Sequence, residues 1–372
     1  MSCLTVLLSP INLLFFIIIA GFAVGKIRIR RISLGIAGIL FVAILAGFII
    51  NRLMPEEYVE ILTDTQSTIK IFSKLGTSLF VSVIGLQTGS SVKNDSKESL
   101  MAFMIGSVMS ISGMMLIQLL SALDKAISYP TLLGVLCGAL TSTPGLSSVC
   151  ELIGTGSEET VWGYGCSYLL GVIFGVFFAQ VFSRNTSGNG SGQAQNTVVA
   201  GKIYPELMLI GITALLGNIL GSIHIPVLLI SVGNTASTLL VGLIAGGIVR
   251  RKRAVTQISP QILNAFRNLG LALFFTGTGF ATGIRSVSFD IKSVLYGALI
   301  TLTAIFCGIL LCRIISSRHR LQGGFVIAGG MTSSPAYGAI GSKANDASVG
   351  HFSFAYFGSL ISLITALQII GR

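Results

Sequence analysis

Charged residues are scarce in this sequence. They make up 10% of its 372 residues, whereas soluble domains average about 25%. Such a low share excludes an ordinary soluble domain. The formal net charge of +11 does not indicate a nucleic-acid partner either, because the basic residues stand in short loops between apolar runs, where lysine and arginine determine membrane topology.

Residues typical of catalytic and metal centres are also few. The histidines His224, His319 and His351 are scattered, and the six cysteines have no zinc-like spacing. The sequence contains no His-Glu-x-x-His motif, no Walker lysine, and no Gly-x-Ser-x-Gly motif with a suitable histidine. We therefore expect no enzymatic activity, no catalytic residues, no cofactor, no metal site and no disulfide.

Apolar residues, in contrast, are abundant. The sequence is 52% hydrophobic, its mean hydropathy is +0.86, and its 45 glycines allow helices to approach closely in lipid. Several of its apolar segments have the roughly 20 residues needed to cross a bilayer, which predicts an all-α polytopic membrane protein. The segments lie near residues 11–25, 33–50, 68–90, 100–122, 131–150, 161–182, 204–222, 225–249, 262–284, 292–316, 323–341 and 350–371.

The two halves of the sequence repeat each other. The segment Thr-Ser-Thr-Pro-Gly at 141–145 recurs as Thr-Ser-Ser-Pro-Ala at 332–336, and residues 72–89 align without gaps onto 266–283 with eight identities in eighteen positions. A polar segment rich in glycine and serine separates the halves and is typical of a flexible linker. We predict three regions, namely a first membrane repeat over 1–183, a linker over 184–203 and a second membrane repeat over 204–372.

Loop charges predict that the two repeats are inverted. The loop at 26–31 is basic and its counterpart in the second half has no lysine or arginine, whereas the next loop of the second half carries Arg-Arg-Lys-Arg at 250–253. By the positive-inside rule, the halves then have opposite orientations, which requires an odd number of crossings per half. We predict about five transmembrane helices and one proline-broken or re-entrant segment per repeat, with both termini outside.

The first candidate site is the pair of proline-containing segments. Proline frees backbone groups that find no water in hydrocarbon, so such backbone persists where it lines a cavity or is buried in protein. Two matched copies predict a solute pathway, although a proline kink whose hydroxyls satisfy nearby carbonyls is the alternative. The residues of this site are Thr141, Ser142, Thr143, Pro144, Gly145, Thr332, Ser333, Ser334 and Pro335.

The second candidate site is the end of the aligned helix pair. Polar residues one or two turns apart can line a helix face toward the bundle interior. Packing is the alternative explanation, because threonines and small residues commonly stabilise helix contacts in lipid. The residues of this site are Gln87, Thr88, Thr278, Thr282 and Arg285.

Ionisable residues are nearly absent from the apolar segments. Lys70, Lys74, Arg267 and Arg285 are nearest to membrane depth. Any of them could pair with a substrate carboxylate, but snorkelling to the membrane interface is the commoner fate of such residues. Proton relays are built from intramembrane acids and bases, so a proton antiporter with a buried aspartate pair is disfavoured.

The proline-containing motifs resemble a known family. Gly-Ala-Leu-Thr-Ser-Thr-Pro-Gly-Leu at 138–146 and Gly-Gly-Met-Thr-Ser-Ser-Pro-Ala at 329–336 resemble the duplicated permease domain of the aspartate:alanine exchanger family. The resemblance covers most of both halves. It implies a bacterial inner-membrane secondary transporter with inverted repeats, in which residues 141–144 and 332–335 line the pathway. Many members carry a large cytosolic regulatory domain between the halves, where this chain has only the short linker.

From the residues and the resemblance together, we expect an antiporter of acidic amino acids or small carboxylates that works by alternating access. Its expected partners are that solute and the lipid bilayer, with no nucleic acid, and a homodimer stays open. A sodium-coupled carrier of another organic anion is the alternative within transport. A gated channel and a non-transporting membrane scaffold are the alternatives from another class.

Overall fold

The computed structural model of the chain describes thirteen stretches of residues. These are 9–26, 28–29, 32–33, 35–53, 59–91, 97–154, 156–183, 203–222, 234–251, 260–284, 291–316, 321–340 and 346–370. The predicted linker over 184–203 lies outside the described residues except for its last residue, which begins a helix.

The described part of the first repeat is helical apart from one very short strand pair. The two-residue strands β1 (Arg28–Ile29) and β2 (Ile32–Ser33) pair antiparallel after the first helix. The helices are α2 (Pro10–Gly25), α3 (Ala37–Leu53), α4 (Val59–Ser91), α5 (Lys97–Leu123), α6 (Tyr129–Ala139), α7 (Thr143–Ile153) and α8 (Ser157–Ser183).

The second repeat has the same order of long and short helices. Its elements are α9 (Ile203–Ser222), α10 (Asn234–Arg251), α11 (Pro260–Ile284), α12 (Ile291–Ser316), α13 (Gly323–Gly330), α14 (Ser334–Ile340) and α15 (Asp346–Ile370). Proline favours the first turn of a helix, because its missing N–H has no intrahelical partner there. Six of the eight prolines occupy such positions, at 10, 130, 144, 205, 260 and 335.

The helices have the lengths and exposed surfaces of membrane spans. Six of the described helices are long and apolar enough to cross a bilayer. Large apolar side chains lie exposed along single helix faces three or four residues apart, as membrane-facing side chains do. On α5 they are Leu100, Met104, Val108, Ile111, Met115 and Leu119, and on α12 they are Leu295, Leu299, Leu302, Phe306 and Leu310. The predicted all-α polytopic fold is confirmed.

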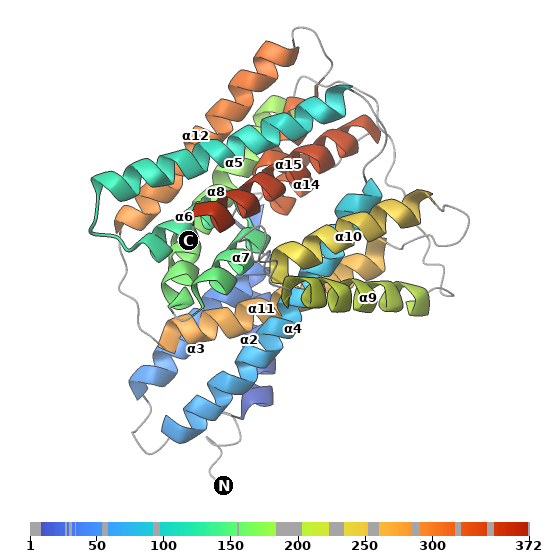
Figure 1. Cartoon of the computed structure of the whole chain (residues 1–372). Helices are drawn as coiled ribbons and strands as arrows, with labels where there is room; N and C mark the ends of the chain where they lie inside the picture. Colours follow the sequence, from blue (N-terminus) through green and yellow to red (C-terminus); the bar gives the residue numbers. More distant parts are fainter. Residues whose placement is uncertain are drawn as a thin grey trace.

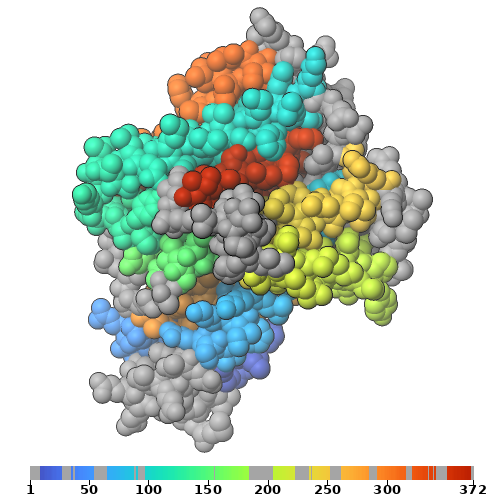
Figure 2. Space-filling model, viewed as in Figure 1, coloured from blue at the N-terminus to red at the C-terminus, as the bar shows by residue number. Residues whose placement is uncertain are grey.

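Each repeat contributes to two groups of helices (Figure 1). We call α2, α3, α4, α9, α10 and α11 the scaffold bundle, and α5–α8 with α12–α15 the hairpin bundle. Most contacts run within a bundle, and fewer join α11 to α8, α7 to α10 and α15 to α4. On the face shown in Figure 2, α15 lies between α5 of its own bundle and α10 of the scaffold bundle. The first three helices of a repeat thus belong to one bundle and the rest to the other.

A pseudo-two-fold relation connects the repeats. Gly76 on α4 and Gly270 on α11, which the sequence alignment matches, pack against each other where the two helices cross. A Cβ built on Gly76 would lie 2.5 Å from the carbonyl oxygen of Gly270, and one built on Gly270 would lie 2.7 Å from that of Gly76. Only residues without a side chain permit this approach. Since the matched residues contact each other, the pseudo-two-fold axis passes through this crossing.

Equivalent helices of the two repeats run in opposite directions, so their equivalent ends lie on opposite sides of the bundle. α4 and α11 cross antiparallel, because Ser73 Oγ donates to the carbonyl of Phe274 at 3.2 Å while Gly76 meets Gly270. α10 runs parallel to α4 and α3 runs parallel to α11. The contacts that fix these directions are Gly85–Gly242, Ser90–Gly246, Leu40–Gly279 and Ile44–Gly283.

The helices α2 and α10 therefore run toward the same side of the bundle, and basic residues follow or close each of them. α10 closes with Arg250 and Arg251 beside the end of α4, and Lys26 follows α2 at the level where α3 begins. We call this the basic end and the other the opposite end. Because successive crossing helices alternate in direction, the start of α2 and the end of α15 both lie at the opposite end. Five crossing helices and one broken segment per repeat satisfy this arrangement.

Candidate functional site

The segment α6–α7 is a re-entrant hairpin. α6 runs parallel to α8, because Gly134 lies against Thr160 near the start of α8 and Gly171 lies against Thr141 further along it. α7 must then return to the level where α8 begins, only three residues after α7 ends. With 11 residues, α6 is about 16 Å long, roughly half the thickness of the hydrocarbon core. The hairpin thus enters halfway and turns back.

The segment α13–α14 enters from the other side. Gly324 at the start of α13 lies against Ala179 near the end of α8, and Gly175 of α8 lies against Ser333 at the tip. The backbone N–H of Gln322 also donates to Nδ1 of His351 at 3.4 Å, which places the start of α13 beside the start of α15. The two tips therefore meet beside the middle of α8, having come from opposite ends.

Each tip ends its first helix in a Schellman motif, in which the two backbone N–H groups after the helix cap donate to carbonyls of the last turn. The four bonds run from Thr141 to Gly138 (2.9 Å), Ser142 to Cys137 (2.7 Å), Thr332 to Gly329 (2.8 Å) and Ser333 to Ala328 (2.9 Å).

A threonine occupies the left-handed position of each motif, where glycine is usual. Thr141 has φ 54° and Thr332 has φ 46°, and within the described stretches they are the two non-glycine residues with positive φ. This conformation costs a β-branched residue on the order of 1–3 kcal/mol. The surrounding structure must hold both residues in place.

The two threonines hold each other's hairpin. Thr141 Oγ1 donates to the carbonyl of Met331 at 2.7 Å, and Thr332 Oγ1 donates to the carbonyl of Leu140 at 2.9 Å. Both carbonyls belong to helix C-caps, which have no partner within their own helix. Glycine at these positions would relieve the strain but would leave two buried carbonyls unpaired. The requirement for a hydroxyl accounts for threonine at both tips.

The second arm of each hairpin starts directly after the tip. Ser142 caps α7 by accepting from the backbone N–H of Gly145 at 3.2 Å, and Pro144 stands in the first turn. Ser333 accepts from the N–H of Ala336 at 3.3 Å in the same manner. Pro335 follows at the position equivalent to Pro144. The side chain of Ser334 lies outside the described residues. The structure thus brings together at one place the residues of the first candidate site that it describes.

Tyrosines of α8 lie between the first tip and the scaffold bundle. Thr143 Oγ1 lies 3.3 Å from the hydroxyl oxygen of Tyr164 on α8. The ring of Tyr164 packs on Tyr168, with centroids 5.2 Å apart, and on Phe275 of α11, with centroids 6.3 Å apart. Sequence reasoning did not single out these tyrosines. Their signal is that Tyr168 and Tyr356 occupy similar places in the last helix of each repeat.

The residues of the second candidate site do not form one cluster. Gln87 Nε2 donates to Asn264 Oδ1 at 2.9 Å, near the start of α11. Thr278 and Thr282 lie near the other end of α11, where each Oγ1 bonds a carbonyl four residues earlier. The repeat alignment matches residues that the inversion separates across the bundle. The side chain of Thr88 and the whole of Arg285 lie outside the described residues.

A carboxylate links the first hairpin to the scaffold bundle at the opposite end. Glu151 on α7 accepts from the backbone N–H groups of Asn234 and Thr235 at the start of α10, the latter at 2.8 Å. Ser147 Oγ lies 3.0 Å from Thr235 Oγ1. A carboxylate is favourable at a helix N-terminus, where N–H groups lack partners. Sequence reasoning missed this contact, because nothing in the sequence pairs α7 with α10.

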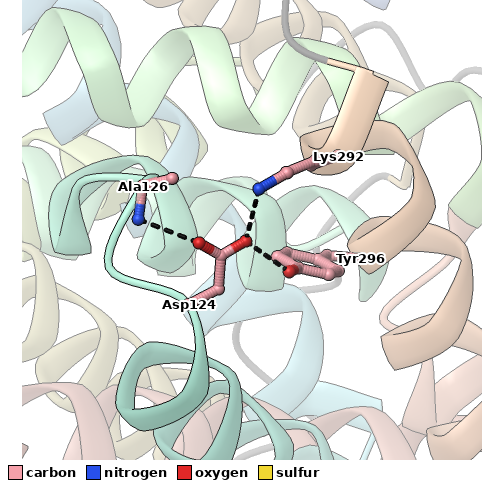
Figure 3. A network of polar contacts seen from close by, with 4 residues as sticks. All are labelled: Asp124, Ala126, Lys292 and Tyr296. Atoms are coloured by element: carbon pink, nitrogen blue, oxygen red, sulfur yellow. Dashed lines mark hydrogen bonds and ion pairs between the residues drawn. The ribbon is translucent and has the colours of Figure 1, made fainter.

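An ion pair connects the two repeats within the hairpin bundle at the same end (Figure 3). Asp124, after α5, accepts from Lys292 Nζ at 2.9 Å, from the Tyr296 hydroxyl at 2.8 Å and from the backbone N–H of Ala126 at 2.9 Å. The hydrogen bond from Lys292 is the largest of the causes that lower the pKa of Asp124 to about 2, followed by those from Ala126 and Tyr296. The base of the first hairpin is thus attached to α12.

Comparison with known proteins identifies the family. The model of the aspartate:alanine exchanger family, described as its predicted permease membrane region (Asp-Al_Ex), matches residues 13–184 and again 209–372. The chain belongs to this family. The double match coincides with the two halves that share the order of helices. Each copy of this permease region contains one re-entrant hairpin.

Relatives of the permease are also named for transport. A relative from Glaesserella parasuis serovar 5, which is named as a transport protein, is 29% identical over 171 residues. These residues are 44% of this chain and 29% of the relative. Uncharacterized transporters of Bacteroides thetaiotaomicron and Corynebacterium glutamicum are 31% and 32% identical over 167 and 169 residues. These alignments cover 42% and 43% of this chain, and 27% and 28% of the relatives. The chain thus aligns with less than a third of each relative.

Proposed function

We propose that this permease is a secondary active antiporter, which exchanges acidic amino acids or small carboxylates across the bacterial inner membrane by alternating access. Family membership and the relatives' names support membrane transport as the general function. The solute class and the exchange mode are our proposals. The orientation with the basic end in the cytoplasm and both termini outside is also proposed, from the positive-inside rule.

The observation that carries the proposal is the meeting of the two hairpin tips. They enter from opposite ends of α8 and are joined by the Thr141 and Thr332 hydroxyls. Interrupted helices at membrane depth, in corresponding places of two inverted repeats, are where secondary transporters bind solutes. Strained backbone also concentrates at functional sites.

The chemistry at the tips suits a zwitterion or a carboxylate. Helix C-termini present carbonyl oxygens that accept from an ammonium group, and helix N-termini present N–H groups that favour a carboxylate. The first tip places the end of α6 next to the start of α7, so both kinds of group occur within a few residues. The hydroxyls of threonine and serine can accept a hydrogen bond from an ammonium group or donate one to a carboxylate.

The division into two bundles provides a means of alternating access. The contacts of the hairpin bundle with the scaffold bundle are fewer than those within each bundle. At the opposite end Glu151 and Ser147 fasten α7 to α10. Release of this contact and closure at the basic end would expose the tips to the other side. Because the repeats are inverted, one structural change serves both directions.

Counterflow in proteoliposomes tests the proposal. Vesicles loaded with unlabelled L-aspartate, L-glutamate, L-alanine or succinate are diluted into the same labelled solute, with and without a sodium gradient. An exchanger accumulates label only when the lumen holds a counter-solute, whatever the sodium gradient. Accumulation that requires sodium identifies the sodium-coupled carrier, flux proportional to voltage identifies a channel, and no flux of any solute overturns transport.

A further inference from the structure

Arg267 lies near the middle of the membrane region. It stands three residues before Gly270, which meets Gly76 on the pseudo-two-fold axis. At 1.5 Å per residue, this is about 4.5 Å along α11 from the crossing. An axis that relates inverted repeats lies in the membrane plane near its centre. Arg267 is therefore at mid-depth, too far from the interface for the snorkelling that the sequence favours.

The neighbours of Arg267 are polar but not acidic. Its Nη1 lies 3.5 Å from Gln87 Oε1, and the same Gln87 donates to Asn264 at 2.9 Å. Among the described residues no carboxylate forms an ion pair with Arg267. In the described stretches this half-buried guanidinium therefore has no acidic counter-charge, which intramembrane arginines usually have.

The first hairpin tip lies beside α11, the helix that carries Arg267. Tyr164, whose hydroxyl lies 3.3 Å from Thr143 Oγ1 at this tip, packs on Phe275 of α11 with ring centroids 6.3 Å apart. A solute at the tip is then within reach of groups from both bundles. This is the position that a transport site requires.

We propose that Arg267 binds a carboxylate of the transported solute and that Gln87 positions its guanidinium. The inference rests on the proposed function and adds the residue that selects anions. Arginine presents a planar fork of N–H donors that matches a carboxylate in two parallel hydrogen bonds, and it stays charged when buried. The solute supplies the negative charge that the described residues around Arg267 lack. Solutes without a carboxylate at this position are rejected, because they leave the charge unpaired.

Monoamides of the solute test this assignment. Counterflow is measured with L-aspartate and with its two monoamides, L-asparagine and L-isoasparagine, for wild type, Arg267→Gln, Arg267→Lys and Gln87→Ala. In wild type one amide should have a KM about 10- to 100-fold above that of L-aspartate, as expected when a charged hydrogen-bonded pair is lost. In Arg267→Gln the KM of that amide should lie within about threefold of the KM of L-aspartate. The reason is that L-aspartate then also lacks the charged hydrogen-bonded pair with Arg267. Arg267→Lys and Gln87→Ala should give intermediate ratios.

The matched control is Arg52→Gln, which removes an exposed arginine at the end of α3 that stacks on Phe48. It should leave the ratios unchanged. Binding of succinate to detergent-purified protein, measured by thermal shift, separates this inference from the proposed function. Stabilisation by succinate that is lost in Arg267→Gln and weakened in Arg267→Lys supports the carboxylate site even without counterflow. Wild-type exchange with unchanged amide ratios in both arginine variants overturns the assignment and leaves the transporter intact.

Discussion

The two hairpins match at their tips and differ in their returning arms. Each tip has a threonine in the left-handed conformation, a Schellman motif and a serine cap. The threonine of each hairpin donates a hydrogen bond to the C-cap carbonyl of the other hairpin. The arm α7 has 11 residues and is fastened to α10 by Glu151. The arm α14 is described as far as Ile340, and within this part of the chain no hydrogen bond joins it to α3.

This difference separates what is constant in the mechanism from what changes. Contacts that obey the repeat symmetry stay the same when the two repeats exchange roles, so the tips form the constant part. In the proposed mechanism, contacts that break the symmetry differ between the two access states. The Glu151 contact, which fastens α7 to α10 at the opposite end, is the described contact that we expect to differ.

The largest expected effect is at the tips. Thr141→Val and Thr332→Val each remove a buried hydroxyl and leave a helix-cap carbonyl unpaired, which costs about 1–3 kcal/mol of unfolding free energy. Because the bonds are reciprocal, we expect equal losses of stability and near-complete loss of counterflow in both variants. Thermal unfolding in detergent and the counterflow assay measure the two effects.

Serine variants are the matched control for the tips. Thr141→Ser and Thr332→Ser keep the hydroxyl and remove the β-branch, so they should unfold and exchange nearly as wild type does. If Thr141→Val and Thr332→Val differed widely from each other, the symmetric description of the tips would be wrong.

A smaller effect is expected from the prolines. Pro144→Ala and Pro335→Ala leave the tips bonded but free the first turn of each second arm, which costs about 0.4–1 kcal/mol through the unfolded chain. We expect severalfold slower exchange in both variants, with insertion into the membrane preserved. The assays are counterflow and membrane fractionation. Wild-type rates in both variants, together with wild-type rates in Thr143→Val and Ser334→Ala, would remove the hairpins from the mechanism.

The architecture could be predicted because repeated motifs and loop charges are both visible directly in the sequence. The repeated motif at 141–145 and 332–336, the opposite loop charges and the odd crossing count together implied inverted repeats with re-entrant segments. The sequence also identified the tip residues, since proline and hydroxyls at membrane depth have few other uses. It could not show that Thr141 and Thr332 reach across to each other, because this contact depends on the packing of both hairpins on α8.

The second candidate site shows where alignment misleads. Residues such as Gln87 and Thr282 appear related because the repeats match, yet inversion places the matched ends on opposite sides of the bundle. Arg267 has Ser73 at the equivalent position, so no repeat signal indicated its importance. The depth of Arg267 in the membrane follows from the crossing of Gly76 and Gly270 beside it. The surroundings of a residue that has no counterpart in the other repeat are seen only in the three-dimensional structure.

A modest effect is expected from the asymmetric arm. Glu151→Gln weakens the charge at the α10 N-terminus, and a carboxylate there is worth about 0.3–1 kcal/mol. The two access states should shift about two- to fivefold toward opening at the opposite end, with little change in stability. The rate of labelling of a single cysteine placed at Ser147 reports this opening. Glu159→Gln is the matched control, because Glu159 bonds Ser128 within the hairpin bundle at the same end.

The smallest effect is expected at Asp124, which belongs to neither tip nor arm. The pKa of its carboxyl in the folded protein, about 2, lies below the ordinary aspartate value of 3.8. The ion pair with Lys292 therefore contributes fully above about pH 4 and is lost as the pH falls toward 2. The difference in thermal unfolding between wild type and Asp124→Asn should stay constant from pH 8 to pH 5 and shrink below pH 4. Because the pair joins α12 to the base of the first hairpin within one bundle, cysteine labelling at Ser147 should be unchanged in Asp124→Asn. A shift in labelling as large as that of Glu151→Gln would mean that the hairpin bundle deforms during transport and does not move as a unit.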